Sequence, residues 1–142
     1  MRSWILRTLP LALVLAASCA SSGEGARHLP APGAIGPYSG SVGVGPLVFA
    51  SGKIGSERDG SFAAEAESAI DAVVTELKRS GLELRDVVSV QVYLTDMGRY
   101  AEFNQIYARR LPAPYPARTC VAVAALPAGA RVEITVTAAR SR

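Results

Sequence analysis

The stretch PYPARTCVAVAALPAGARVEITVT, residues 114–137, decides the fold and raises the question of function. Its small and β-branched residues predict two strands, 117–125 and 130–139, joined as a hairpin through LPAG. Arg118 stands near the start of the first strand. Because a cation on a core-forming strand is costly unless an anion meets it, Arg118 is either paired inside the fold or available to a ligand.

Alternation along these two strands assigns their side chains to faces. Arg118 and Cys120 share one face of the first strand. If Ala125 pairs with Ala130 in the hairpin, Glu133 lies on that same face. Four strand residues then leave roughly 13 Å between the backbones of Arg118 and Glu133. The long Arg118 side chain closes part of this distance, and the remaining gap is about the size of a small carboxylate molecule. The register therefore predicts a ligand site over Cys120.

The residue types restrict the chemistry but leave two interpretations open. His28 is the only histidine, and the sequence has neither a CxxC pair nor a Gly-rich phosphate loop, so serine-type, thiol-type, zinc and nucleotide chemistry are disfavoured. The chemistry that remains is acid/base catalysis by a carboxylate, with an arginine that anchors the ligand. Alternatively, Arg118 and Glu133 form a structural ion pair across a subunit contact, and Cys120 is a small buried hydrophobe.

The remaining periodicities complete an α+β domain. Short apolar runs predict strands at 38–44 and 47–54, and alternation predicts a strand over 86–95. Apolar residues at three- and four-residue spacing predict helices over 62–80 and 98–111. The resulting order is ββαβαββ. With so few helices, both must pack on one face of a mixed sheet.

The N-terminal segment indicates export. Residues 1–20 have a basic start, a short apolar run and a small-residue exit, the layout of a secretory signal peptide. LAASC resembles the bacterial lipoprotein box, so lipidation of Cys19 is expected, with ordinary cleavage after Ala20 as the alternative. Residues 21–37, rich in Ser, Gly and Pro, predict a linker before a domain at 38–142. We therefore expect an exported bacterial protein, either periplasmic or anchored to the membrane by its lipid.

Removal of the leader changes the charge balance. Arg2 and Arg7 leave with it, so the 15 basic residues fall to 13 against 12 acidic residues, and the net charge falls from +3 to +1. A nearly neutral domain lacks the electrostatic footprint of a nucleic-acid binder, so no nucleic-acid partner is expected.

Five segments, APGAIGPYS, FASGKI, VVSVQVYLTDM, FNQIYA and PYPARTCVAVAALPAGARVEI, run in this order from about Ala31 to the C-terminus. Together they resemble the RidA/YjgF family of enamine and imine deaminases. The resemblance implies a chorismate-mutase-like α+β fold that assembles as a homotrimer, with the sheets lining a central barrel and the helices outside. It also implies that the ligand pockets lie in the clefts between subunits.

The resemblance implies roles for individual residues as well. Arg118 matches the arginine that binds the substrate carboxylate, and Glu133 matches the acidic residue that positions and activates the hydrolytic water. No cofactor and no metal are implied. Two departures stand out, because Lys53 and Gly40 occupy positions where the family usually, or often, has glutamine. The matches around the substrate are Tyr38, Ser51, Gly52, Asn104 and Cys120.

The predicted activity is hydrolysis of reactive 2-imino or enamine acids to 2-oxo acids and ammonia, as in a 2-iminobutanoate/2-iminopropanoate deaminase. A guanidinium fork can hold the carboxylate of such a substrate bidentately, and a glutamate can serve as acid and base toward water and the leaving ammonia. Export separates the protein from the cytoplasm, where such imines normally form. The alternative is therefore a non-catalytic small-carboxylate-binding or chaperone-like trimeric module in the cell envelope.

Overall fold

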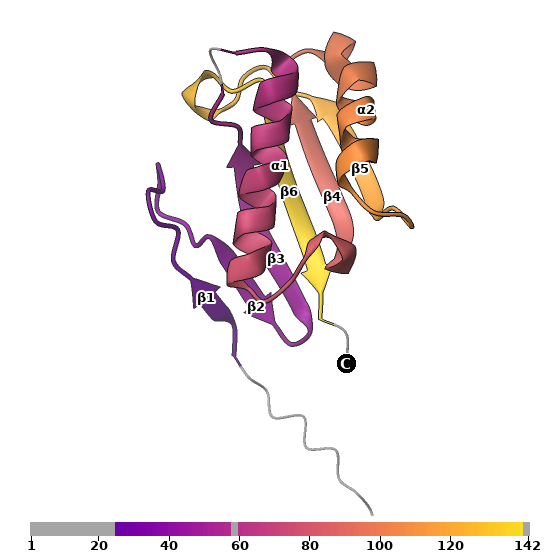
Figure 1. The fold of residues 1–142 in the computed structure, drawn as a ribbon. Coiled ribbons are helices and arrows are strands. Elements are labelled where there is room, and N and C mark those ends of the chain that lie inside the picture. The colour runs from indigo at the N-terminus through magenta and orange to yellow at the C-terminus, as the bar shows by residue number, and fades with distance from the viewer. Residues whose placement is uncertain (1–24, 58–59, 141–142) are drawn as a thin grey trace, which may run out of the picture.

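The computed structural model describes residues 25–57 and 60–140 (Figure 1). The predicted signal peptide and Cys19 lie outside these residues. Within the described part, no helix is both long enough and apolar enough to cross a membrane. The strands are β1 (Arg27–Leu29), β2 (Ser41–Val44), β3 (Leu47–Ile54), β4 (Val87–Leu94), β5 (Ala117–Ala122) and β6 (Val132–Ala139), and the helices are α1 (Phe62–Arg79) and α2 (Tyr100–Arg110).

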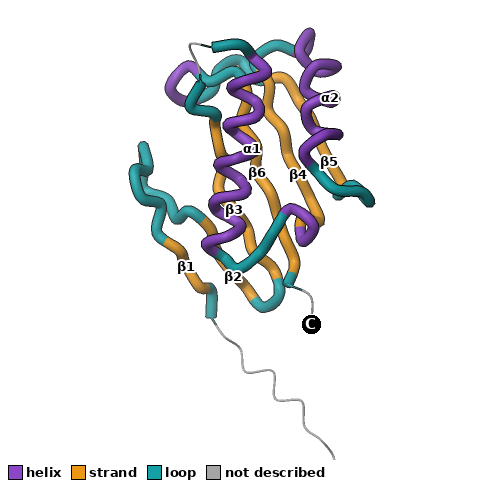
Figure 2. The backbone as a smooth tube through the Cα atoms, viewed as in Figure 1, coloured by secondary structure: helices purple, strands orange, loops and turns teal. Residues whose placement is uncertain are grey.

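The strands form one mixed sheet in the order β1-β2-β3-β6-β4-β5, and both helices lie on one face of it (Figure 2). Strands β4 and β5 are parallel and are connected through α2, whereas the other neighbours are antiparallel. A parallel pair needs such a long crossover because its second strand must start at the same end as the first. The predicted α+β class, with two helices on one face of a mixed sheet, is confirmed.

Helix α1 packs its apolar stripe against the sheet. The helix begins at an N-cap, where the Ser61 hydroxyl accepts a hydrogen bond from the backbone N–H of Ala64 at 3.1 Å. Within the described residues the other sheet face carries no helix (Figure 2), so apolar side chains such as Phe49 and Val121 stay exposed there. Buried members of the α1 stripe are Ala66, Ala69, Ile70, Val73 and Leu77.

The predicted hairpin between the last two strands is wrong. In the structure β4 lies between β5 and β6, pairing parallel with the first and antiparallel with the second. The LPAG segment therefore spans the end of β4 instead of making a tight turn. The sequence suggested a hairpin because the connection is short, but the apolar β4 strand pairs on both sides and takes the central place.

Local boundaries differ from the predictions at several elements. Strand β2 begins at Ser41 and not at residue 38, β5 ends at Ala122 and not at residue 125, and β6 begins at Val132 and not at residue 130. The segment expected to be a linker contains β1, which pairs with β2, so ordered structure begins before Tyr38. The second helix starts two residues later than expected, because Met97–Arg99 forms a short 3₁₀ turn first. Strand β3 has the predicted limits.

Candidate functional site

The structure divides the predicted site residues between the two faces of the sheet. Arg118 lies opposite Val90 of β4 and faces the helices, whereas Glu133 lies opposite Tyr93 of β4 and faces away from them. Two strand spacings across the sheet and three residues along β4 put their backbones roughly 14 Å apart. The expectation that both side chains share one face is wrong, because it rested on the hairpin register. A single chain therefore does not bring this cation and this carboxylate together.

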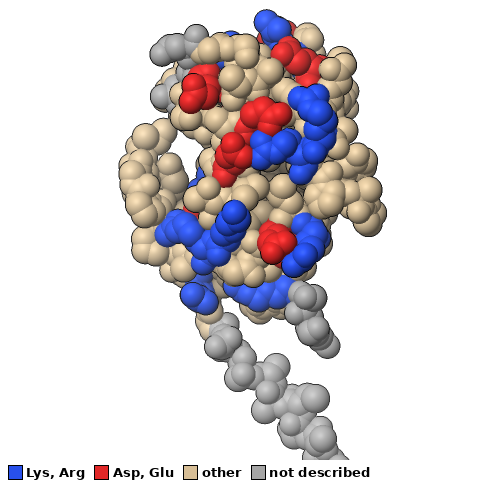
Figure 3. Space-filling view, in the orientation of Figure 1, with Lys and Arg blue, Asp and Glu red and all other residues tan. Residues whose placement is uncertain are grey.

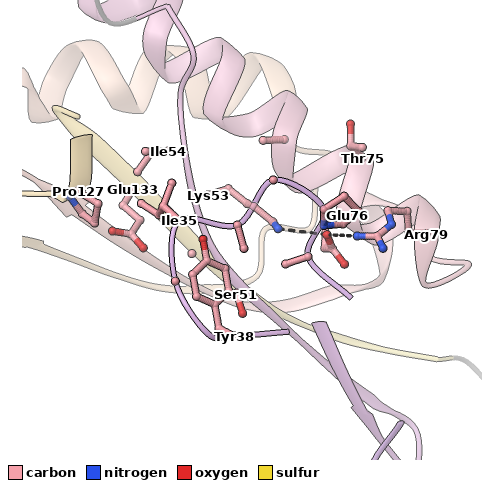
Figure 4. Close-up of a pocket in the computed structure, with 17 residues that line it drawn as sticks. Ile35, Tyr38, Ser51, Lys53, Ile54, Thr75, Glu76, Arg79, Pro127 and Glu133 are labelled. Carbon is pink, nitrogen blue, oxygen red and sulfur yellow. Dashed lines mark hydrogen bonds and ion pairs between the residues drawn. The ribbon is translucent and has the colours of Figure 1, made fainter. Parts of the chain in front are cut away.

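Glu133, Tyr38, Ser51 and Gly52 do come together. They line one cavity of about 950 Å³ between the segment 31–36, the outer edge of β3 and helix α1 (Figure 4). Figure 3 shows this cavity as an opening between the segment after β1 and the body of the domain. We call this arrangement the Glu133 cavity.

The backbone of β3 allows Glu133 to approach closely. A Cβ atom on Gly52 would lie 1.7 Å from Oε1 of Glu133, so a larger residue would force the carboxylate out of this position. The pairing of β3 with β6 shifts register between Ala50 and Lys53, and the strand irregularity falls at this point. Ser51 ties the strand to the preceding loop, because its hydroxyl donates to the carbonyl of Ser39 at 2.6 Å.

Arg118 belongs to a second group, built on α2, which we call the Arg118 cluster. Its Nη2 donates to Oδ1 of Asn104 at 2.6 Å, and its guanidinium carbon lies 4.6 Å from the centre of the Tyr107 ring and 5.7 Å from that of Tyr100. Cation–π contacts of this kind hold a guanidinium in place without using its hydrogen-bond donors. Among the described residues, Nε and Nη1 of Arg118 have no hydrogen-bond partner, so the group can still bind a carboxylate.

Cys120 lies beside Arg118 and is half-buried. Burial raises the pKa of its thiol, and the opposing effect of the Arg118 charge is smaller. The thiol is therefore protonated at neutral pH and is a poor nucleophile. Cys120 packs against the hydrophobic core and does not line the Glu133 cavity; its predicted role as a pocket wall stays a prediction.

Comparison with known proteins supplies the family. The family model described as Endoribonuclease L-PSP matches residues 29–140. The chain belongs to this family. It is the RidA/YjgF family that the sequence motifs indicate, and the match starts within β1, ahead of the predicted domain start.

Individual members of the L-PSP family are similar over most of their length. Protein HMF1 of Saccharomyces cerevisiae is 41% identical over 77% of this chain and 88% of its own length. The human protein named 2-iminobutanoate/2-iminopropanoate deaminase is 39% identical over 76% of this chain and 83% of its own length. The crystal structure of Escherichia coli TdcF with bound serine shares 35% identity, covers 78% of this chain and 94% of that one, and superposes with a TM-score of 0.73.

The two departures from the L-PSP family pattern have one explanation, which sequence analysis missed. Glu76 of α1 is only 4% exposed, and its Oε2 accepts hydrogen bonds from Lys53 at 3.1 Å and from Arg79 at 2.9 Å. A Cβ on Gly40 would lie 2.8 Å from Oε1 of Glu76. Lys53 thus supplies a partner for the buried carboxylate, and Gly40 leaves room for it. The available signal was an acidic residue in the apolar stripe of α1, between Val73 and Leu77.

The carboxylate of Glu76 is ionised. Burial by itself raises the pKa of Glu76, but the hydrogen bond from Ser41 at 2.8 Å and the charges of Lys53 and Arg79 together outweigh it and hold the pKa below the ordinary value. A carboxyl whose pKa is lowered by folding stabilises the folded state above its unfolded pKa, and this contribution is lost as the pH falls through the folded pKa.

The substitution Glu76→Gln tests this cluster. At pH 7 we expect it to lower the free energy of unfolding by about 1–3 kcal/mol, since two partly buried cations lose their counter-ion. The difference from wild type should shrink as the pH falls below the ordinary carboxyl pKa of 4.5, because the wild-type group is then protonated too. Urea unfolding at several pH values measures both effects.

A surface glutamate provides the control. Glu102→Gln breaks the exposed pair with Arg99 and should change stability by less than about 0.5 kcal/mol. Equal free energies of unfolding for the Glu76→Gln protein and wild type at pH 7 would show that the ionised Glu76 carboxylate does not stabilise the fold.

Proposed function

We propose that the protein hydrolyses 2-imino and enamine acids to 2-oxo acids and ammonia, in sites formed between the subunits of a homotrimer. Glu133 of one subunit and Arg118 of the next would complete each site. The named activity of the human relative and the bound serine of the TdcF structure support a substrate of this size that carries a carboxylate. The mechanism requires no cofactor.

The separation of Arg118 and Glu133 is the observation that carries the proposal. Arg118 lies with Asn104, and Glu133 lies with Tyr38, Ser51 and Gly52. The side chains of Arg118 and Glu133 nevertheless face opposite sides of one sheet. The family resemblance implies pockets in the clefts between subunits, and a second copy is the simplest source of the missing half. Residues from two chains then share one site, as happens in heterologous ring interfaces.

The helix-free face of the sheet also supports assembly. It carries exposed Leu47, Phe49 and Val121, which are 36%, 45% and 41% exposed. Leu47 and Phe49 are neighbours on one face of β3, and Val121 lies on the same sheet face three strands away, on β5. Exposed apolar side chains spread over a sheet face favour packing of that face against another protein surface. Packing of this face against copies of the same chain would form the inner lining that the resemblance predicts.

The chemistry follows from the two side chains. The guanidinium of Arg118 would bind the substrate carboxylate, which fixes the neighbouring C=N carbon beside Glu133 of the other subunit. With the substrate as the protonated imine, Glu133 acts as general base and takes a proton from water while the water oxygen bonds to that carbon and the C=N π electrons move to nitrogen, which gives a carbinolamine. As general acid, Glu133 returns this proton to the amine nitrogen; the C–N bond then breaks as the hydroxyl oxygen forms the C=O bond, and the hydroxyl proton passes to the departing ammonia, which leaves as ammonium together with the 2-oxo acid.

Variants of these two residues test the function. With 2-iminopropanoate generated in place by an amino-acid oxidase, wild type should accelerate formation of the 2-oxo acid. Glu133→Gln should lower the rate by about 10²–10⁴-fold yet still bind a small carboxylate. Arg118→Ala should lose activity and also about 10–100-fold in carboxylate affinity.

Matched controls are the exposed residues Glu102→Gln and Arg85→Ala, which should keep wild-type rates. A wild-type rate for Glu133→Gln would contradict the mechanism. If the folded wild-type protein does not accelerate hydrolysis at all but binds small carboxylates, the non-catalytic binding module is the correct function.

We also propose that the protein is exported and lipidated at Cys19. Fusing residues 1–37 to a reporter that is active only in the periplasm should give activity, because the segment has the layout of a signal peptide. The Cys19→Ser variant should move from the membrane fraction to the soluble fraction, since it lacks the lipid-bearing thiol. A Cys19→Ser protein that still fractionates with membranes would rule out lipidation.

A further inference from the structure

The Glu133 cavity continues beyond the proposed reaction centre. From Gly52 onward no described strand pairs with the outer edge of β3, and the cavity runs around that edge toward α1. Lys53 lies opposite Ile134 and so faces the helices, whereas Ile54 lies opposite Glu133. One cavity therefore has Glu133 on one side of β3 and a group of charged residues on the other (Figure 4).

The far end of the cavity carries a net positive charge. Lys53, Glu76 and Arg79 all line it, and the two cations share one carboxylate. Glu76 is further engaged by Ser41, and Nη2 of Arg79 donates to the carbonyl of Pro30 at 2.7 Å. We call Lys53, Glu76 and Arg79 the cationic end of the cavity.

The cations are more accessible than the carboxylate between them. The side chains of Lys53 and Arg79 are 17% and 33% exposed, against 5% for Glu76. Within the described part of the chain, the Lys53 ammonium donates one hydrogen bond, to Glu76, and an ammonium has three donors. A molecule entering from the cavity therefore meets unused donors and positive charge first, with the carboxylate behind them.

We infer that the cationic end binds a second carboxylate, so that the preferred substrates are 2-imino acids of dicarboxylic amino acids. The inference rests on the proposed function, which places the reacting carbon beside Glu133. A four- or five-carbon diacid would then extend along the edge of β3, with its distal carboxylate at Lys53 and Arg79. That carboxylate would balance the net positive charge and form charge-assisted hydrogen bonds with the unused donors.

The remaining lining suits such a chain. Ile35, Ile54 and Ala72 line the cavity with apolar surface. The hydroxyl of Thr75 is turned to its own helix, donating to the carbonyl of Asp71 at 2.9 Å. A methylene chain can therefore pass between Glu133 and the cationic end without burying an unsatisfied polar group.

The test compares the purified chain on two substrates. An amino-acid oxidase generates 2-iminopropanoate from alanine and 2-iminoglutarate from glutamate, and kcat/KM is measured for each. Wild type should favour the diacid. The Lys53→Gln variant, which keeps the length and removes the charge, should lower the diacid-to-monoacid ratio by about 10–100-fold, and Lys53→Arg should largely retain it.

Lys78→Gln is the matched control, because it removes the same charge from an exposed position near the end of α1; it should not change the ratio. A wild-type ratio unaffected by Lys53→Gln, from a protein that hydrolyses 2-iminopropanoate, would overturn the inference and leave the proposed function standing.

A binding measurement covers the case in which neither imino acid is hydrolysed, where the proposed function fails. Calorimetry with glutarate and with propanoate then tests the cationic end alone. Tighter binding of glutarate that is lost in Lys53→Gln supports the subsite, and equal binding of the two acids overturns it.

Discussion

The position of β4 between β5 and β6 is the constraint on which the site depends. Because β4 pairs with both, residues that are near in sequence are separated by a whole strand, and their faces are set independently. Arg118 is directed to the helix layer, where Asn104 and the aromatic rings of α2 hold it. Glu133 is directed to the helix-free side, where it lines the cavity. Under the proposed function, one domain would thus present two halves of a reaction centre, and a second copy would join them.

A second buried interaction shapes the cavity. Glu76 replaces apolar packing in α1 with a carboxylate, and it is tolerated because Ser41, Lys53 and Arg79 satisfy it and Gly40 leaves space. The same arrangement leaves positive charge facing the cavity. If the cationic end binds a second carboxylate as proposed, stability and substrate preference are linked through these side chains, and substitutions there should be assessed for both.

Much of the fold could be predicted from the sequence, because periodicity reports local structure directly. The strand over 47–54 and the helix from Phe62 have the expected limits within a residue. The pairing of strands could not be predicted in the same way. Alternation along β5, which begins at Ala117, assigns its side chains to two faces but does not show which strand lies beside it. Three-residue β1 lies among Ser, Gly and Pro residues and has no period to detect. Family resemblance assigned Arg118 and Glu133, but only the strand order shows that one chain holds them apart.

Mixed trimers test the central claim most directly. Arg118→Ala and Glu133→Gln chains with different tags can be expressed together, and trimers that contain both can be purified and assayed for imine hydrolysis. If each site takes Glu133 from one subunit and Arg118 from the next, every trimer that contains both chains, in either ratio, has one intact site out of three. We therefore expect about a third of wild-type activity from the purified mixed trimers and almost none from either variant alone. Mixed trimers that stay as inactive as the single variants would contradict a site shared between subunits.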